Sequence, residues 1–118
     1  MNAPSHPLSQ FVKIPGIATP IPVESISHFE GFGNYSRLFF VGKTRPIVAS
    51  QTLKLFELQL PGFLRVSKSY LVNPLHITAL DRQDGRTLEL TLDNQASVLV
   101  ARRRVEHIRT QLITPGTH

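Results

Sequence analysis

The chain of 118 residues contains no cysteine, and this absence removes several kinds of chemistry at once. Without thiols the protein forms no disulfide bond, Fe–S cluster or cysteine zinc site, and it has no thiolate nucleophile. Its five histidines are scattered, and no two have the spacing that puts two imidazole rings on one helical face. We therefore expect neither a metal site nor a cofactor.

Long apolar segments and the common catalytic motifs are missing as well. The longest apolar runs, such as Leu38 to Val41, fall far short of the roughly 18 residues that a membrane span needs. Residues 1–22 lack the apolar segment of a signal peptide. The sequence has no P-loop, Gly-x-Gly-x-x-Gly or Gly-x-Ser-x-Gly motif. We expect a cytoplasmic protein that is not an enzyme, binds no small-molecule substrate and contacts no membrane.

Acidic residues are few compared with basic ones, since 13 Lys and Arg face 8 Asp and Glu for a net charge of +5. The excess is uneven along the chain. Residues 34–68 hold six basic residues against one acidic residue, and residues 101–118 hold four against one. Residues 69–100 have a net charge of −2. Two separate basic segments favour an anionic partner such as nucleic acid.

Proline and apolar periodicity divide the chain. Five of the nine prolines lie in the first 22 residues, which predicts a flexible arm or linker over residues 1–20, one domain over 21–113 and a tail over 114–118. Within the domain, alternating or short apolar runs between turn residues predict antiparallel strands. These strands are expected over 26–30, 35–41, 47–49, 63–67, 77–80 and 87–92. The predicted fold class is mainly β.

Two short helices are expected. Ser50 is the predicted N-cap of a helix that ends near Gln59, and a second helix is predicted over Ala101 to Leu112. At 100° per residue, Arg103 lies almost opposite the apolar stripe that includes Val105, so we expect its side chain to point away from the core.

Several short motifs, taken in order, resemble a known family. They are Ile26-x-x-Phe29-Glu30, Leu53-x-x-Phe56-Glu57-x-x-Leu60-Pro61, Arg65-Val66-x-Lys68-Ser69-Tyr70-Leu71-Val72-Asn73 and Ala101-Arg102-Arg103. From Ile21 to Leu112 the chain resembles the LytTR DNA-binding domain, the effector domain of many bacterial response regulators in two-component systems. The resemblance implies an elongated fold of stacked antiparallel sheets with one or two short helices. It also implies that loops at one edge of the domain enter successive major grooves of promoter DNA.

The resemblance and the charge pattern together predict the DNA contacts. Residues 35–37, Lys68 with Ser69, and Arg102 with Arg103 occupy the family's contact positions, and Arg103 is the expected reader of guanine. Lys68 departs from the family's usual Arg or Asn and lacks the guanidinium fork. Two copies on direct repeats would make a homodimer on the DNA. The full set of candidates is Asn34, Tyr35, Ser36, Arg37, Lys43, Arg45, Lys68, Ser69, Arg102, Arg103 and Arg104.

Other interpretations of these residues remain open. Asn34 suits a turn, Lys43 and Arg45 could serve only to solvate a turn, and the three arginines could form a solvated run stabilised by an ion pair between Arg102 and Glu106. The alternative function is an RNA or single-strand binder on a small β-barrel, with Phe32, Tyr35 and Phe39 stacking on bases. A protein-interaction module that uses exposed strand edges is a third class.

Overall fold

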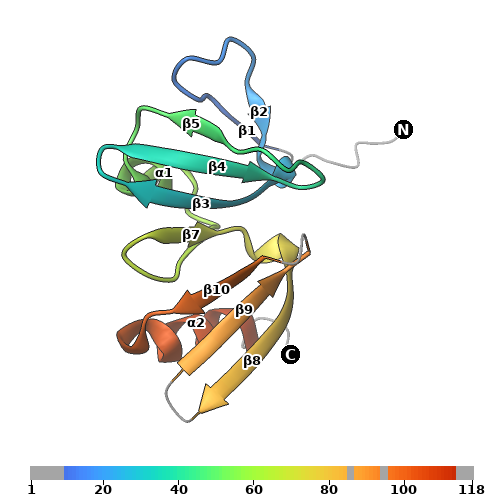
Figure 1. Ribbon diagram of the computed structural model, residues 1–118, viewed down its shortest axis with the longest axis vertical. Helices are drawn as coiled ribbons and strands as arrows, with labels where there is room; N and C mark the ends of the chain where they lie inside the picture. Colours follow the sequence, from blue (N-terminus) through green and yellow to red (C-terminus); the bar gives the residue numbers. More distant parts are fainter. Residues whose placement is uncertain (1–9, 85–86, 94–95, 114–118) are drawn as a thin grey trace.

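The computed structural model describes residues 10–84, 87–93 and 96–113. Within these residues the chain forms three antiparallel sheets and two short α-helices (Figure 1). The elements are β1 (Phe11–Val12), β2 (Ile21–Pro22), η1 (Val23–Ser25), β3 (Ile26–Phe32), β4 (Tyr35–Phe40), β5 (Ile47–Ala49), α1 (Leu53–Gln59), β6 (Leu64–Arg65), β7 (Tyr70–Val72), η2 (Pro74–His76), β8 (Ile77–Asp84), β9 (Thr87–Leu92), β10 (Ser97–Val100), η3 (Arg102–Arg104) and α2 (Val105–Ile113), where η marks a 3-10 helix. The predicted fold class is confirmed.

The two larger sheets are stacked, and each is covered by one helix. The five-stranded sheet has the order β5-β4-β3-β7-β6 and carries α1, and the three-stranded sheet has the order β10-β9-β8 and carries α2 (Figure 1). Phe29 of β3 packs on Phe56 of α1 with ring centroids 4.6 Å apart, in what we call the upper core. The lower core lies between Leu88, Leu90 and Leu92 of β9 and Ile108 of α2. Strict alternation in β9 puts all three leucines on that one face.

Strand β7 separates the two cores. Consecutive residues of a strand point to opposite faces, so Leu71 belongs to the upper core and Val72 to the lower one. Both are fully buried. A strand that is buried on both faces appears in the sequence as a continuous apolar run, which is why residues 70–72 do not alternate.

Two polar side chains near the end of β7 link segments that are far apart in the sequence. The buried amide of Asn73 donates from Nδ2 to the backbone oxygen of Ile26 at 2.9 Å. Nδ1 of His76 lies 2.7 Å from Oδ2 of Asp93, and Nε2 of the same ring lies 2.6 Å from the backbone oxygen of Glu24. The ring therefore links the smaller sheet to the segment that leads into β3.

Both predicted helices begin later than expected. Thr52, not Ser50, is the N-cap of α1, and its Oγ1 accepts from the backbone N–H of Leu55 at 3.4 Å. Residues 50–52 stay out of the helix because the backbone oxygen of Gln51 accepts a hydrogen bond from the hydroxyl of Ser36 in β4. The C-terminal helix is α-helical only from Val105, and the three arginines before it form a 3-10 turn.

The predicted arm overlaps the folded core. Residues 1–9 and the expected tail 114–118 lie outside the described residues. In the described part, β1 pairs with β2, and Val12 and Ile14 are buried in the upper core. These two side chains complete that core, although they lie within the segment that we expect to form an arm.

A buried histidine makes the stability of this fold depend on pH. His28 lies in β3, stacks on Phe39 with ring centroids 4.4 Å apart, and has Oγ of Ser27 3.1 Å from its Nδ1. Desolvation by burial lowers the pKa of His28 from 6.5 to about 4, against a smaller opposing effect of the Glu30 charge. Between these pH values the unfolded chain binds a proton that the folded chain does not, so His28 stabilises the fold fully above pH 6.5 and less as the pH falls towards 4.

We expect the contribution of His28 to the free energy of unfolding to fall by about 2–3 kcal/mol between pH 7.5 and pH 4.5. Urea denaturation of the wild type and of His28→Gln at both pH values measures it, because glutamine does not titrate. The variant should lose less stability on acidification than the wild type. Equal losses in the two proteins would contradict the prediction.

Candidate nucleic-acid interface

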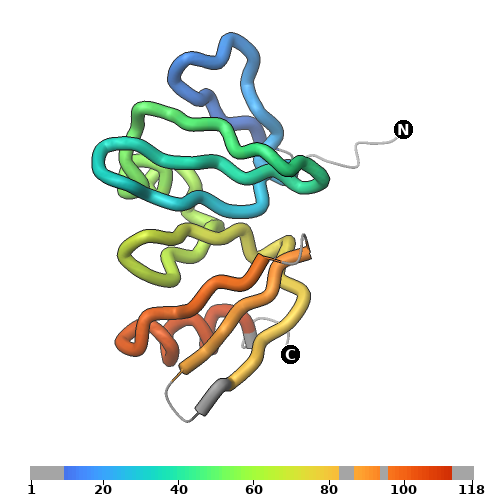
Figure 2. Tube along the Cα trace, viewed as in Figure 1, coloured from blue at the N-terminus to red at the C-terminus, as the bar shows by residue number. Residues whose placement is uncertain are grey.

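Three segments that are far apart in the sequence meet at one edge of the molecule. They are the β3–β4 turn, the β6–β7 loop at residues 66–69, and η3, and all three lie at the left in Figures 1 and 2. Backbone hydrogen bonds connect them: the N–H of Gly31 donates to the oxygen of Ser69 at 2.8 Å, and the N–H of Ala101 donates to the oxygen of Val66 at 2.8 Å. We call these three segments the contact edge.

The β3–β4 turn presents Asn34 and Tyr35 to solvent. Gly33 has a φ of +61°, a conformation that glycine adopts without strain, so the turn can be tight. Tyr35 stacks on Phe32 with ring centroids 5.8 Å apart, and Cζ of Arg37 lies 4.0 Å from the Phe32 ring centroid. Both aromatic rings are exposed, at 36% for Phe32 and 48% for Tyr35. The end of the hairpin is thus an exposed aromatic pair beside a cation.

Two predicted contact residues in β4 have partners inside the molecule. Ser36 is buried, and its hydroxyl donates to the backbone oxygen of Gln51 at 2.7 Å. Arg37 is half-buried and pairs with Oε1 of Glu30 at 3.2 Å. The hydroxyl of Tyr70 donates to the other oxygen of that carboxylate, also at 3.2 Å. Burial and the negative charge of Glu30 raise the pKa of Tyr70, so its hydroxyl keeps the proton that it donates.

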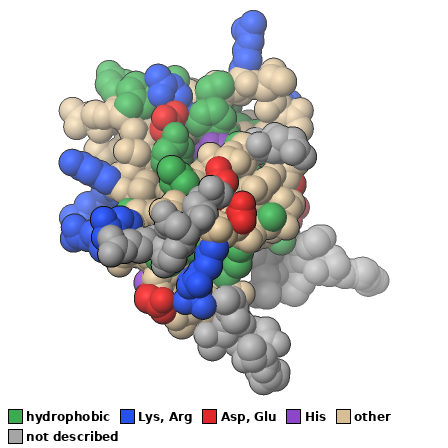
Figure 3. All heavy atoms as spheres, turned by 60° about the horizontal axis from the view of Figure 1, so that its bottom comes forward, with side chains coloured by type: hydrophobic (Ala, Val, Ile, Leu, Met, Phe, Trp, Pro, Cys, Tyr) green, Lys and Arg blue, Asp and Glu red, His purple; other side chains and the backbone are tan. Residues whose placement is uncertain are grey.

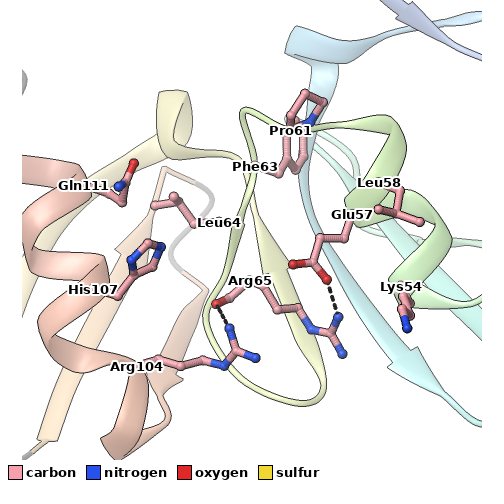
Figure 4. Close-up of a pocket in the computed structure, with 10 residues that line it drawn as sticks. All are labelled: Lys54, Glu57, Leu58, Pro61, Phe63, Leu64, Arg65, Arg104, His107 and Gln111. Carbon is pink, nitrogen blue, oxygen red and sulfur yellow. Dashed lines mark hydrogen bonds and ion pairs between the residues drawn. The ribbon is translucent and has the colours of Figure 1, made fainter.

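The β6–β7 loop is organised by Arg65, which the sequence did not single out as a site residue. Its Nε and Nη2 donate to the backbone oxygens of Ser67 and Lys68, both at 2.8 Å, and its Nη1 pairs with Oε1 of Glu57 in α1 at 2.7 Å (Figure 4). All three donating nitrogens of the guanidinium are therefore engaged. The loop leaves Lys68 and Ser69 exposed. In the sequence, the signal for this role was an arginine beside a valine, just before the polar segment Ser67-Lys68-Ser69.

The three consecutive arginines have different environments. Arg102 and Arg103 are exposed, as predicted for Arg103, whereas Arg104 is half-buried and its Nη1 donates to the backbone oxygen of Arg65 at 3.1 Å. Glu106 pairs with Arg109 at 2.9 Å and not with Arg102. The cations precede α2 at its N-terminus, where the helix dipole disfavours positive charge. An anionic partner would relieve that repulsion.

Three of the unpaired cations lie together at the contact edge. Among the described residues, the side chains of Lys68, Arg102 and Arg103 make no hydrogen bond or ion pair. Figure 3, turned about the horizontal axis, shows Lys and Arg side chains gathered on the same left side. Lys43 and Arg45 lie apart from them, in the β4–β5 turn at the opposite end of β4 (Figure 1).

The aromatic residues of the alternative single-strand surface do not all gather in one place. Phe32 and Tyr35 are exposed neighbours, but Phe39 is half-buried and stacks on His28. A base cannot stack on a ring face that another side chain covers. The exposed aromatic surface is thus one pair at the end of a hairpin, smaller than the platform expected of a single-strand binder.

Two further properties concern the described part of the chain. None of its helices is long and apolar enough to cross a membrane. Likewise, residues 10–84, 87–93 and 96–113 bring together no group of three His, Asp or Glu side chains that could hold a metal ion.

Comparisons with known proteins show the family and the fold. Residues 18–113 match the family described as the LytTr DNA-binding domain. In fold, the chain is similar to the LytTr DNA-binding domain of a protein described as a methyl-accepting/DNA response regulator from Bacillus cereus. The TM-score is 0.71, the sequence identity is 23%, and the match covers 89% of this chain and 96% of the other. No curated protein sequence matches the chain significantly. Since the family match spans most of its length, the chain belongs to the LytTr DNA-binding domain family.

Proposed function

We propose that this chain binds double-stranded promoter DNA in a sequence-specific manner, as the effector domain of a bacterial transcription regulator. The observation that supports the proposal most is the contact edge, where three hydrogen-bonded segments present Lys68, Arg102 and Arg103, which have no partner among the described residues. A DNA duplex supplies the missing negative charge along a surface of this kind.

Each side chain of the contact edge has a proposed role. Arg103 enters the major groove and donates to O6 and N7 of a guanine, and Arg102 and Lys68 bind flanking phosphates. Ser69 and Tyr35 offer hydroxyl donors to the backbone of the DNA. Arg37, Arg65 and Arg104 position the loops, because their guanidinium groups have internal partners. Two copies on direct repeats complete the proposed assembly.

Selection of bound duplexes from a random pool tests the proposal. A recurring motif in two spaced copies is the expected result. The selected duplex should then resist competition by its own separated strands and by RNA of the same sequence. Stronger competition by a single strand would refute the proposal in favour of the single-strand function, to which Phe32 and Tyr35 would contribute.

The salt dependence of DNA affinity tests whether the DNA contacts the contact edge or the opposite end of β4. If about six phosphates are neutralised, log K for the selected duplex should fall against log salt with a slope near −5. Lys68→Ala should make that slope shallower by about 0.9, because one phosphate contact is lost. Lys43→Ala removes the same charge from the opposite end of β4 and should leave the slope unchanged. Equal changes in the two variants would show that the overall charge, and not the contact edge, drives binding.

A further inference from the structure

An open hollow of about 550 Å³ lies between the two helices (Figure 4). Residues of α1, of β6 and of the segment from η3 into α2 line it. Its volume lies within the range of small-molecule sites, roughly 300–1,000 Å³. None of the exposed contact residues Lys68, Arg102 and Arg103 lines it. The hollow is thus a separate feature of the fold.

One part of the hollow is apolar. Leu58 of α1 is 69% exposed there, although a leucine on a short amphipathic helix is usually placed against a core. Leu64 of β6, which is half-buried, extends the apolar surface towards α2. These side chains provide a site for a flat apolar group, whose burial would remove Leu58 from water.

Three of the other lining residues are cations, namely Lys54, Arg65 and Arg104. Lys54 projects from α1, Arg104 and His107 come from the side of α2, and Arg65 lies between them (Figure 4). Glu57 is the one carboxylate in the lining, and it is already paired with Arg65. Of the nitrogens of the Arg104 guanidinium, only Nη1 has a partner among the described residues. Cations with free donors beside an apolar wall are complementary to an anion that carries an apolar body.

We propose that this hollow binds a small organic anion, a carboxylate attached to a flat apolar group, and that its occupation weakens DNA binding. The carboxylate accepts from Arg104, with His107 on the same side of the hollow and Lys54 on the α1 side, and the apolar group extends between Leu64 and Leu58 (Figure 4). The second part of this proposal, that occupation of the hollow weakens DNA binding, rests on the proposed function. Arg104 donates to the backbone oxygen of Arg65, whose guanidinium holds the β6–β7 loop, so a ligand that engages Arg104 also acts on the contact edge.

Binding is tested without DNA, by titrating the isotope-labelled chain with sodium 2-naphthoate and following backbone amide chemical shifts. The expected result is saturable binding with a Kd on the order of 1 mM, with the largest shifts at Leu58, Leu64 and His107. The neutral isostere 2-naphthamide should bind at least about fivefold more weakly, because the charged hydrogen bonds are lost. Equal binding of the two probes, or shifts spread evenly over the surface, would overturn the site.

Two substitutions in α1 test whether naphthoate binding depends on the hollow or only on the charge of the helix. Leu58→Glu puts a carboxylate into the apolar wall and should abolish naphthoate binding. Leu55→Glu makes the same change three residues earlier, at a residue that is 49% exposed and does not line the hollow, and should bind as the wild type does. Both side chains are exposed, so both variants should fold, and urea denaturation checks this. Equal loss of binding in the two variants would overturn the site.

The coupling is tested on the selected duplex with saturating 2-naphthoate, against sodium acetate at the same concentration. We expect DNA affinity to fall at least about threefold in the wild type and not in Leu58→Glu. Unchanged affinity in the wild type would refute the coupling. If no duplex is bound under any condition, the proposed function fails, whereas the result of the naphthoate titration still stands.

Discussion

Replacing Arg103 with alanine is expected to weaken binding to the selected duplex by about 1–3 kcal/mol, which is roughly 5- to 150-fold. The side chain is exposed, has no internal partner among the described residues, and lies on η3 at the contact edge. Because a guanidinium binds O6 and N7 of guanine with two parallel hydrogen bonds, its removal should also relax the preference at one base pair. Gel-shift titrations with the selected duplex and its single-base variants measure both effects.

The neighbouring arginine is the matched control. Arg102→Ala removes the same group from the adjacent exposed position and should weaken binding to specific and random duplexes alike, because a phosphate contact carries no sequence information. If Arg103→Ala also lost the same factor on both duplexes, Arg103 would be a phosphate contact and not a base reader. Neither change should lower the free energy of unfolding measurably, since neither side chain has an internal partner among the described residues.

Arg65→Ala is expected to lower the free energy of unfolding by about 2–3 kcal/mol and to weaken DNA binding, although its guanidinium has only internal partners. The side chain is only 17% exposed, and its removal leaves the backbone oxygens of Ser67 and Lys68 without their donor and Glu57 without its cation. The β6–β7 loop then loses the conformation that directs Lys68 and Ser69 outwards. Urea denaturation and DNA titration of the same preparations measure the two effects.

Two conservative variants separate positioning from charge. Arg65→Lys keeps the positive charge, but its single ammonium nitrogen cannot reach the three acceptors that the guanidinium fork spans, so it should not restore DNA binding. Glu57→Gln leaves both loop oxygens bonded to Arg65 and should have a much smaller effect, because the side chain of Glu57 is 40% exposed. Recovery of wild-type DNA affinity in Arg65→Lys would mean that Arg65 acts as a charge towards the DNA and not as a positioning residue.

The fold was predictable mainly where a pattern is local. Strict alternation in residues 87–92 predicts one strand with one buried face, and this is how β9 packs on α2. The N-cap of α1 was not predictable in the same way, because Ser50 and Thr52 are both good caps. The choice depends on a hydrogen bond from Ser36 to Gln51, between residues 15 positions apart. Likewise, the burial of Ser36 follows from the packing of β4 against the segment before α1.

In the candidate site, too, one residue was predictable from the local sequence and another was not. The position of Arg103 relative to Val105 predicts an outward side chain, and this holds although the first turn is 3-10 and not α-helical, because a residue two positions before a buried one points away from it in either kind of helix. Arg104 has a similar sequence context but donates to the backbone oxygen of a residue 39 positions earlier. Residue types alone carry no information about such a partner.

By itself, the sequence determined the fold class, the family, the absence of thiol chemistry and the two basic segments, because composition, periodicity and short motifs are local properties of the chain. Only the tertiary structure decided which of the cations are free. Hydrogen bonds between distant backbone groups bring residues 31–35, 66–69 and 102–104 to one edge, and they place Lys43 and Arg45 at the other. The tertiary structure also gives Arg37, Arg65 and Arg104 internal partners, because it places carboxylate or backbone oxygens within reach of their guanidinium groups.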